Sequence, residues 1–158
     1  MAITFTNKAA GEMRERVNKI VGFGAEQVWV STFHSACVRI LRRYIDRIGY
    51  SNDFTIYDTE DQKKLLKDVI KNLNLDPKMY KENAVLGKIS DFKNKLVTTG
   101  EVAQMAQSDF KLLNLSKIYN NYQEALKKNN ALDFDDLIMK TVQLFRKCPE
   151  VWKVIRKD

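Results

Sequence analysis

The chain has 158 residues, 44% of them hydrophobic and 30% charged, which is enough apolar material for one ordinary core or for a small core plus an incomplete one. This composition excludes disordered and collagen-like chains, and no apolar run is long enough to cross a bilayer. The net charge of +7 favours polyanionic partners but does not by itself indicate a nucleic-acid role, because many other proteins are equally basic.

The first fifty residues carry the pattern of an α/β fold. Residues 2–6 are short, apolar and β-branched, which predicts a buried strand followed by a helix. Residues 28–30 predict a second strand, and Ser31 or Thr32 would cap a helix that Gly49 ends. This order predicts a parallel sheet. Because two parallel strands do not close a core, we expect the remaining strands to lie in a longer parent chain.

From about residue 51 onward the apolar residues recur at helical spacing, which predicts a series of helices inserted in the α/β domain. The predicted fold is therefore mostly α with a small parallel β element. The expected signals are a capping box at Thr59 and Gln62, a helix start at Asp76-Pro77, a short helix at 102–107, a helix end at Asn129-Asn130, and a last helix capped by Asp133 and interrupted by Pro149.

The two cysteines, Cys37 and Cys148, are far apart and fit no metal-binding spacing. We expect both to be reduced, largely buried thiols. The first residues lack the basic and apolar regions of a signal peptide. The sequence therefore predicts a cytoplasmic protein.

The most informative stretch for function is the turn after the first predicted strand. It holds an aromatic side chain, Phe5, and the polar residues Thr6, Asn7 and Lys8. Ligands of open parallel sheets bind at this edge, where an aromatic ring can stack on a base and polar groups can hold phosphate oxygens. The alternative is a buried strand phenylalanine with a routine Asn cap, and the residues alone favour that alternative.

A second turn of the same kind is predicted at Thr32, Phe33 and His34. Thr32 and His34 could donate hydrogen bonds to backbone phosphates at a helix N-terminus. The alternative makes Thr32 a helix cap and His34 a partly buried polar residue. His34 is the only histidine, which excludes a two-histidine metal site within this chain.

Four arginines follow on the next predicted helix. Because Arg39, Arg43 and Arg47 recur every four residues, they would form one basic ridge opposite the apolar face, with Arg42 beside it. The ridge could line a nucleic-acid channel, although a solvated helix face is the more common meaning of such a run.

The stretch 132–138 carries three carboxylates, which could cap a helix, hold a metal or orient a basic side chain, and the capping role is favoured. The sequence contains no G-x-x-x-x-G-K-[ST] phosphate-binding loop and no strand that ends in an Asp-Glu pair. It also offers no Ser-His-Asp arrangement and no paired cysteine ligands. We therefore expect that this chain alone does not hydrolyse ATP.

Three segments together resemble the UvrD/Rep/PcrA family of superfamily 1 DNA helicases. Residues 2–13 (AITFTNKAAGEM) are similar to helicase motif Ia, and residues 30–35 (VSTFHS) are similar to motif Ib. Residues 132–137 (LDFDDL) resemble a further family motif that follows the helical insertion. The order and spacing of all three fit the family, and the resemblance runs over nearly the whole chain.

The resemblance implies a parent protein that moves 3′ to 5′ on single-stranded DNA in DNA repair or replication, using ATP and Mg²⁺ that bind outside this chain. It implies a partial RecA-like motor domain at 1–50, a helical 1B subdomain at 51–130 that touches the duplex junction, and a return to the motor domain at 131–158. Phe5 would stack on a base, while Asn7, Thr32 and His34 would contact the strand. The remaining DNA-contacting candidates are Thr6, Lys8, Phe33, Arg39 and Arg43.

Other readings of the sequence stay open. A helicase-nuclease of the same superfamily is one possible parent. A non-catalytic helical module that binds nucleic acid or another protein is the alternative from a different class, and it gives Phe5 no role. Exposed sheet edges would also allow dimerisation.

Overall fold

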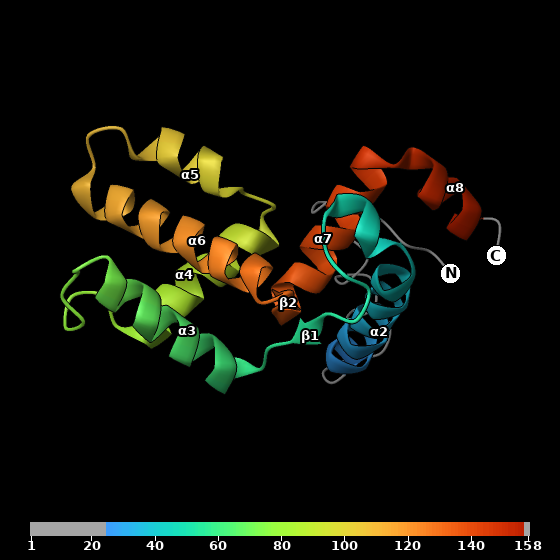
Figure 1. The fold of residues 1–158 in the computed structure, drawn as a ribbon, viewed down its shortest axis with the longest axis horizontal. Helices are drawn as coiled ribbons and strands as arrows, with labels where there is room; N and C mark the ends of the chain where they lie inside the picture. Colours follow the sequence, from blue (N-terminus) through green and yellow to red (C-terminus); the bar gives the residue numbers. More distant parts are fainter. Residues whose placement is uncertain (1–24, 157–158) are drawn as a thin grey trace. The chain divides into compact units, whose positions relative to one another are not determined.

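The computed structural model describes residues 25–156, which divide into two compact units. Unit 1 contains the described residues up to Phe54 together with those from Asp136 onward, and unit 2 runs from Thr55 to Asp135. Both units are built mainly from α-helices (Figure 1). The mostly helical fold with a small parallel sheet agrees with the prediction, although neither described strand lies at residues 28–30.

Unit 1 is formed by helix α2 (Ala25–Tyr44), the 3-10 helix η1 (Ile45–Ile48), most of α7 (Phe134–Lys147), and α8 (Pro149–Arg156). Gly49 ends η1 in the left-handed region at φ 90°, as predicted, because glycine reaches this conformation without a steric penalty. The fully buried residues of this unit come from both chain segments and include Cys37, Leu41, Ile45, Phe54, Leu137 and Leu144.

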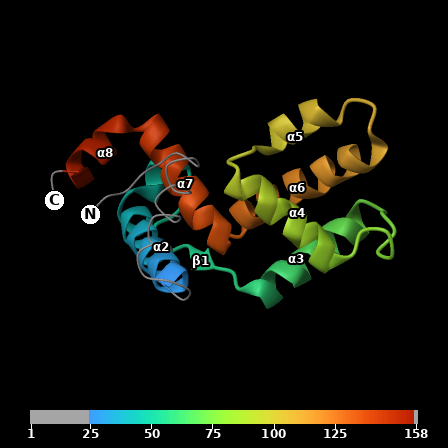
Figure 2. The same cartoon turned by 180° about the vertical axis from the view of Figure 1, so that it is seen from behind.

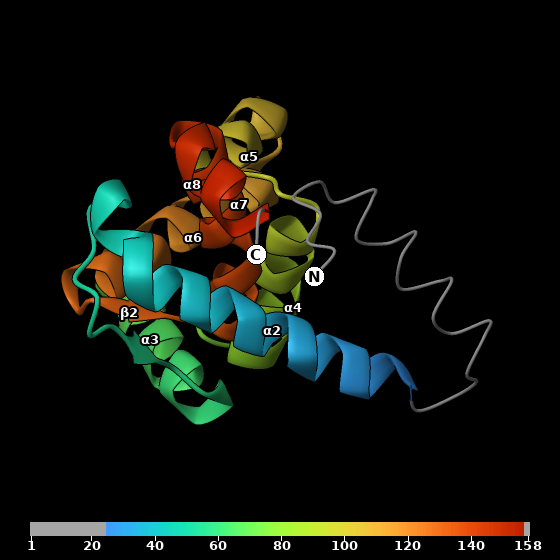
Figure 3. The same cartoon turned by 90° about the vertical axis from the view of Figure 1, so that its right-hand side faces the viewer.

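The predicted strand at residues 28–30 is wrong, because α2 runs through it without a break (Figure 3). Ser31 and Thr32 consequently lie inside this helix and do not cap it. Three apolar residues in a row fit a strand and a helix equally well. Val30 stands three residues before Phe33, so it extends the apolar pattern of the predicted helix toward the N-terminus. The other predicted strand, at residues 2–6, lies outside the described residues.

Pro149 interrupts the last predicted helix, as expected. It separates α7 from α8 and takes the first position of α8, where its missing N–H has no helical partner to lose. Asp133 directly precedes α7, at the position where the sequence predicted a cap.

Unit 2 consists of four helices whose longest member is central. These are α3 (Thr59–Asn72), α4 (Glu82–Asn94), α5 (Thr99–Ala106) and α6 (Phe110–Lys128). In Figure 1, α6 lies between α5 and α3, and the view from behind in Figure 2 brings α4 to the front. The core combines aliphatic side chains from all four helices with the buried rings of Tyr80, Tyr119 and Tyr122.

The chain enters and leaves unit 2 through two short parallel strands. Strand β1 (Thr55–Ile56) pairs with β2 (Ala131–Leu132), so that Thr55 lies opposite Ala131 and Ile56 opposite Leu132. The N–H of Tyr57 extends the ladder by donating to the Leu132 carbonyl at 2.7 Å. The parallel element therefore joins the two ends of unit 2, where the sequence predicted only helices.

Two predicted helix starts in unit 2 are displaced. The capping box of α3 uses Asp58 and Asp61 in place of Thr59 and Gln62. Asp76-Pro77 forms a single turn, in which the Asp76 carboxylate accepts from the Lys78 N–H at 2.9 Å, and α4 begins only at Glu82. The short helix predicted at 102–107 is present as α5, although it begins three residues earlier, and the end of α6 at Asn129 agrees with the prediction.

Three helices in unit 2 end in the same way. Asn74, Leu96 and Asn130 follow α3, α4 and α6, each has a positive φ, and each donates its N–H to the carbonyl three residues earlier. Gln107, which follows α5, also has a positive φ but a ψ of -100°. Residues in the left-handed region turn the chain sharply at the end of a helix. Across the described residues, no helix is both long and apolar enough to cross a membrane.

Candidate nucleic-acid interface

The first group of predicted contact residues, Phe5, Thr6, Asn7 and Lys8, lies outside the described residues. Their roles in base stacking and phosphate binding stay predictions from the sequence. The second group lies on α2, and the correction to the fold changes its geometry.

Thr32, Phe33 and His34 are not in a turn after a strand, because all three belong to the middle of α2. The ring of Phe33 is 8% exposed and belongs to the core of unit 1, which leaves it little surface for a base. His34 is half-buried. The sequence prediction of one shared strand edge therefore fails here, because the second strand does not exist.

The basic ridge predicted on this helix is present in part. Arg39 and Arg43 are exposed and stand one turn apart on α2, which puts them on the same face. The guanidinium carbon of Arg43 lies 5.9 Å from the centre of the Tyr44 ring. Neither arginine forms an ion pair with any residue in the described part of the chain. Both charges are consequently available to an anionic partner.

Arg42, next to this pair, has a structural role. Its Nη1 donates hydrogen bonds to the carbonyl oxygens of Asn52, at 3.0 Å, and Phe54, and its guanidinium carbon lies 3.8 Å from the centre of the Phe54 ring. The Asn52 side chain donates back to the Arg42 carbonyl at 2.7 Å. Arg42 thus clamps the segment after Gly49 against the end of α2.

Arg47 is partly neutralised. Its Nη1 lies 3.2 Å from Oε1 of Glu150 on α8, and its guanidinium carbon lies 5.4 Å from the centre of the Tyr44 ring. Both partners are exposed, and an exposed pair of this kind adds only about 0–1 kcal/mol to stability. The part of the predicted ridge that keeps its full charge is therefore Arg39 and Arg43.

The acidic stretch contains one deeply buried carboxylate in unit 2. Asp133 is 1% exposed, and its Oδ2 lies 2.6 Å from Nζ of Lys93 on α4. The same oxygen accepts a hydrogen bond from the hydroxyl of Tyr122 at 2.8 Å. The ammonium of Lys93 also lies 5.0 Å from the centre of the Tyr122 ring. Of the three roles considered for this stretch, the geometry supports the orientation of a basic side chain, while the capping role that the sequence favoured stays a prediction.

No metal centre forms from these carboxylates. Among the described residues, no group of three or more His, Cys, Asp or Glu side chains is placed to hold a metal ion. The Lys93 ammonium occupies the position next to Asp133 where a cation would bind.

The buried thiol of unit 1 is chemically quiet. Burial raises the pKa of Cys37 from 9.0 to about 11, and a hydrogen bond with Thr141 lowers it by a smaller amount. Cys37 is therefore a neutral thiol at neutral pH, which makes it a poor nucleophile. Cys148 is also free but only half-buried, so the prediction of two largely buried thiols holds for Cys37 alone.

Two features were missed by the sequence reasoning. Lys93 lies forty residues from its partner, and nothing in the local sequence distinguishes it from other lysines. The second feature is the set of lysines at positions 81, 88 and 95, which lie at the two ends of α4 and in its middle, and their regular spacing can be seen in the sequence.

Comparisons with known proteins give a consistent result. A family model described as the UvrD/REP helicase N-terminal domain matches residues 1–158. The chain is 54% identical over 151 residues to the ATP-dependent DNA helicase PcrA of Staphylococcus aureus (strain Mu50), a match that covers 96% of the chain and 20% of that protein. Identity to the PcrA helicase of Bacillus subtilis (strain 168) is 52% over 151 residues, with the same coverage of both chains. The chain thus spans about a fifth of the length of these curated relatives.

Proposed function

The chain belongs to the UvrD/REP helicase family, and on that premise we propose that it is the part of an ATP-dependent 3′–5′ DNA helicase that contacts single-stranded DNA. The observation that carries this proposal is the exposed pair Arg39 and Arg43 on α2. Arginine suits phosphate contacts because its planar, permanently charged guanidinium presents several donors to the phosphate oxygens.

The continuous helix gives these contacts a rigid support. Arg39 and Arg43 lie four residues apart, about one turn, so they occupy one face of α2 over a length of about 6 Å, and we propose that Thr32, earlier in the same helix, adds a further contact. We propose that this face follows the phosphate backbone of the strand. His34 lies on a different face of the helix, so its contact requires the strand to bend around α2.

Base contacts would come from the preceding segment. We propose that Phe5 stacks on a base while Thr6, Asn7 and Lys8 hold neighbouring phosphates. Stacking on an aromatic ring adds about 1–3 kcal/mol per base and tolerates any sequence, which suits a protein that moves along DNA. Phosphate contacts would position the strand, and the ring would engage successive bases.

ATP and Mg²⁺ would act elsewhere in the parent protein. This sequence has no G-x-x-x-x-G-K-[ST] loop to cradle phosphates, so its own residues do not fit the phosphates of ATP. We propose that hydrolysis in the parent moves this DNA-contacting surface relative to the strand, and that the chain alone does not hydrolyse ATP.

Unit 2 would be the helical insertion of the motor domain, the 1B subdomain. Supporting this assignment, its two ends lie side by side in the β1–β2 pair, which allows a whole unit to be inserted at one point of another fold. The flanking segments at 1–50 and 131–158 would belong to the RecA-like domain. In the parent protein, unit 2 would contact DNA at the duplex junction.

The test is fluorescence anisotropy of labelled oligo(dT) with the 158-residue chain across a salt series. Replacing Arg39→Ala and Arg43→Ala together should lower the slope of log K against log salt by about 1.4, since each phosphate contact on a single strand contributes roughly 0.7. Phe5→Ala should weaken binding by about tenfold, within the 1–3 kcal/mol range of one stacked base.

The matched control is Arg146→Ala with Arg156→Ala, which removes the same charge from exposed positions on α7 and α8. If the control lowers the slope as much as the α2 pair does, binding reflects only net charge and the proposed interface is wrong. An ATP-hydrolysing activity that co-purifies with the chain, measured as phosphate release, would contradict the assignment of hydrolysis to other parts of the parent.

A further inference from the structure

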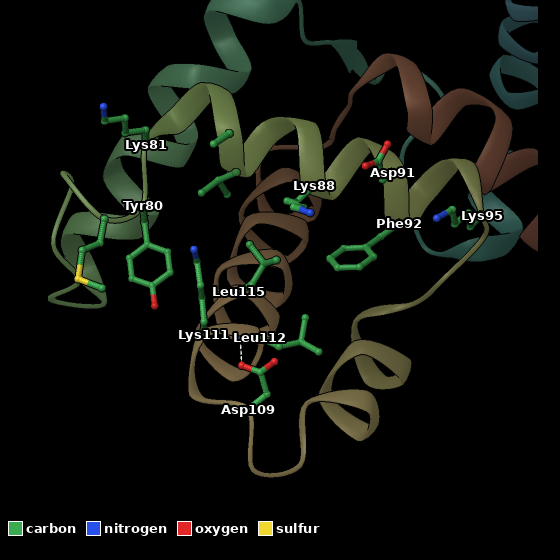
Figure 4. Close-up of a pocket in the computed structure, with 13 residues that line it drawn as sticks. Tyr80, Lys81, Lys88, Asp91, Phe92, Lys95, Asp109, Lys111, Leu112 and Leu115 are labelled. Atoms are coloured by element: carbon green, nitrogen blue, oxygen red, sulfur yellow. Dashed lines mark hydrogen bonds between the residues drawn. The ribbon is translucent and has the colours of Figure 1, made fainter.

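Unit 2 contains a groove that plays no part in the proposed DNA contacts. It has a volume of about 480 Å³ and lies between α4 and α6, with the turn at Met79 and Tyr80 at one end (Figure 4). Its apolar floor includes the aliphatic side chains of Val85, Leu112 and Leu115 and the ring of Phe92. Cavities of about 300–1,000 Å³ are the usual size for seating a ligand or a few side chains. We call it the α4–α6 groove.

The rim of the α4–α6 groove is basic. Lys88 lies on α4, Lys81 and Lys95 flank the two ends of that helix, and Lys111 lies in the first turn of α6 (Figure 4). None of these four lysines forms an ion pair with a residue that the structure describes. The rim also holds two carboxylates, and one of them, on Asp109, caps α6 by accepting from the Leu112 N–H at 3.2 Å.

The aromatic rings of the groove are already engaged within unit 2. The ring of Phe92 stacks on Tyr119 with the centres 5.7 Å apart. Tyr80 is 7% exposed, and its hydroxyl accepts a hydrogen bond from Asn114 at 2.9 Å. Nucleic-acid grooves combine positive charge with free aromatic faces. This floor offers aliphatic side chains, which suit the apolar side chains of a protein better than bases.

The edge of the groove adds a further apolar surface. Met79 lines it and is 67% exposed. Methionine is flexible and polarizable, so it adapts to the side chains of a bound segment. An apolar floor with an adaptable edge and unpaired ammonium groups around it is complementary to an amphipathic chain of negative charge.

We propose that the α4–α6 groove docks an acidic amphipathic segment of a partner protein. Apolar side chains spaced three or four residues apart would fill the cavity between Val85 and Leu115, as in helix-in-groove recognition. Carboxylates on the same segment would face Lys88 on one side and Lys111 on the other. This interaction goes beyond the proposed function, because it uses unit 2 and none of the proposed DNA-contacting residues.

The experiment is a selection from a displayed library of random peptides against the whole 158-residue chain. Clones are counter-selected against the variant Ala84→Trp, in which an indole fills the groove from an exposed position on α4. We expect the surviving clones to carry net negative charge and at least two large apolar residues at helical spacing. A library without such enrichment, or clones that bind the filled variant equally well, would overturn the proposal.

Charge is tested separately on the enriched peptides by anisotropy. Lys88→Glu with Lys111→Glu should weaken binding by about tenfold or more, because both substitutions place a carboxylate opposite the peptide's own. Lys67→Glu with Lys117→Glu is the matched control, since both are exposed lysines of unit 2 that do not line the groove, and binding should change less than about twofold. An equal loss of peptide affinity in both variants would mean that the peptides respond only to net charge, and the proposal would be wrong.

Two measurements keep the outcome decisive. Circular dichroism checks that Ala84→Trp is folded, and if it is not, the surface variant Lys88→Glu with Lys111→Glu decides alone. Oligo(dT) binding is measured on the same variants. If filling the groove abolishes oligonucleotide binding, the groove is a nucleic-acid site and the proposal is wrong. A loss of oligonucleotide binding that occurs only in Arg39→Ala with Arg43→Ala concerns the proposed function and leaves the groove proposal intact.

Discussion

The two units differ in the cations that they use. All eight arginines of the chain lie outside residues 55–135, whereas unit 2, which spans that range, carries thirteen lysines and no arginine. Arginine presents a planar fork of donors that fits phosphate and carbonyl groups, while lysine is a compact point charge on a flexible stem. The two units therefore bring different chemistry to an anionic partner.

Each unit nevertheless also uses a cation to stabilise its own fold. In unit 1 the neighbours Arg42 and Arg43 have opposite roles, because Arg42 holds two backbone carbonyls and Arg43 faces outward. In unit 2 Lys93 is 2% exposed and paired with Asp133, while Lys88 on the same helix is exposed. A cation is therefore structural when the fold places a partner next to it, and its position in the sequence pattern does not decide this.

The largest expected effect tests the buried lysine of unit 2. Lys93→Met should destabilise unit 2 by about 3–5 kcal/mol, because it leaves the Asp133 carboxylate buried without its counter-ion. Urea unfolding followed by circular dichroism measures the loss. The double variant Lys93→Met with Asp133→Leu removes both charges and should recover most of the stability.

The double variant decides what the pair does. If it is as unstable as Lys93→Met alone, the loss of unfolding free energy comes from the altered packing around position 93 and not from an unpaired carboxylate. The Tyr122 hydroxyl loses its acceptor in the double variant, so Tyr122→Phe on that background should restore a further part of the stability.

The second effect compares the two adjacent arginines of unit 1. Arg42→Ala should cost about 2–3 kcal/mol, since two carbonyl oxygens lose a charged donor and the Phe54 ring loses its cover. Arg43→Ala should change stability by less than about 0.5 kcal/mol, as expected of an exposed residue. Thermal unfolding of both variants provides the measurement, and equal destabilisation would contradict the division of roles.

The third effect concerns pH and belongs to unit 1. The unfolded chain releases the Cys37 proton near pH 9.0, whereas the folded chain holds it until about pH 11. The stability contributed by the neutral thiol is therefore complete below pH 9 and is lost as the pH rises toward 11, to an extent of about 2 kcal/mol. The measurement is the difference in unfolding free energy between the wild type and Cys37→Ala at each pH, which removes the titration of other groups. A difference that stays constant from pH 8 to 11 would show that Cys37 does not titrate in this range.

Much of unit 2 could be predicted from the sequence, and the reason is periodicity. In α6, Ile118, Tyr122 and Leu126 recur at four-residue spacing, and these side chains are buried as predicted. The end of that helix at Asn129-Asn130 was also correct, because Asn tolerates the positive φ that Asn130 adopts. Long amphipathic helices carry enough repeats to determine their own type.

The errors arise where the sequence signal is short or non-local. The run at 28–30 has too few residues to separate a strand from a helix, and the helix continues through it. Strands β1 and β2 have two residues each, and they are defined only by pairing with each other. For the candidate site, the sequence identified the exposed arginines, but burial of Phe33 and the partner of Asp133 depend on the tertiary fold.

The smallest expected effect tests whether the cap and the glycine of α5 influence the stability of that helix alone or of the whole of unit 2. Thr98 caps α5 by accepting from the Glu101 N–H at 3.2 Å, so Thr98→Ala should cost about 1 kcal/mol. Gly100→Ala should act in the opposite direction by about 0.5–1 kcal/mol, because Gly100 lies within α5 and an added methyl group meets nothing closer than the Thr98 hydroxyl at 3.9 Å. Amide hydrogen exchange should show both changes in α5 and little change in α6. Since α5 has eight residues and would be marginal alone, a loss of protection that extends through α6 would mean that the bundle unfolds as one cooperative body and that the cap supports all of unit 2.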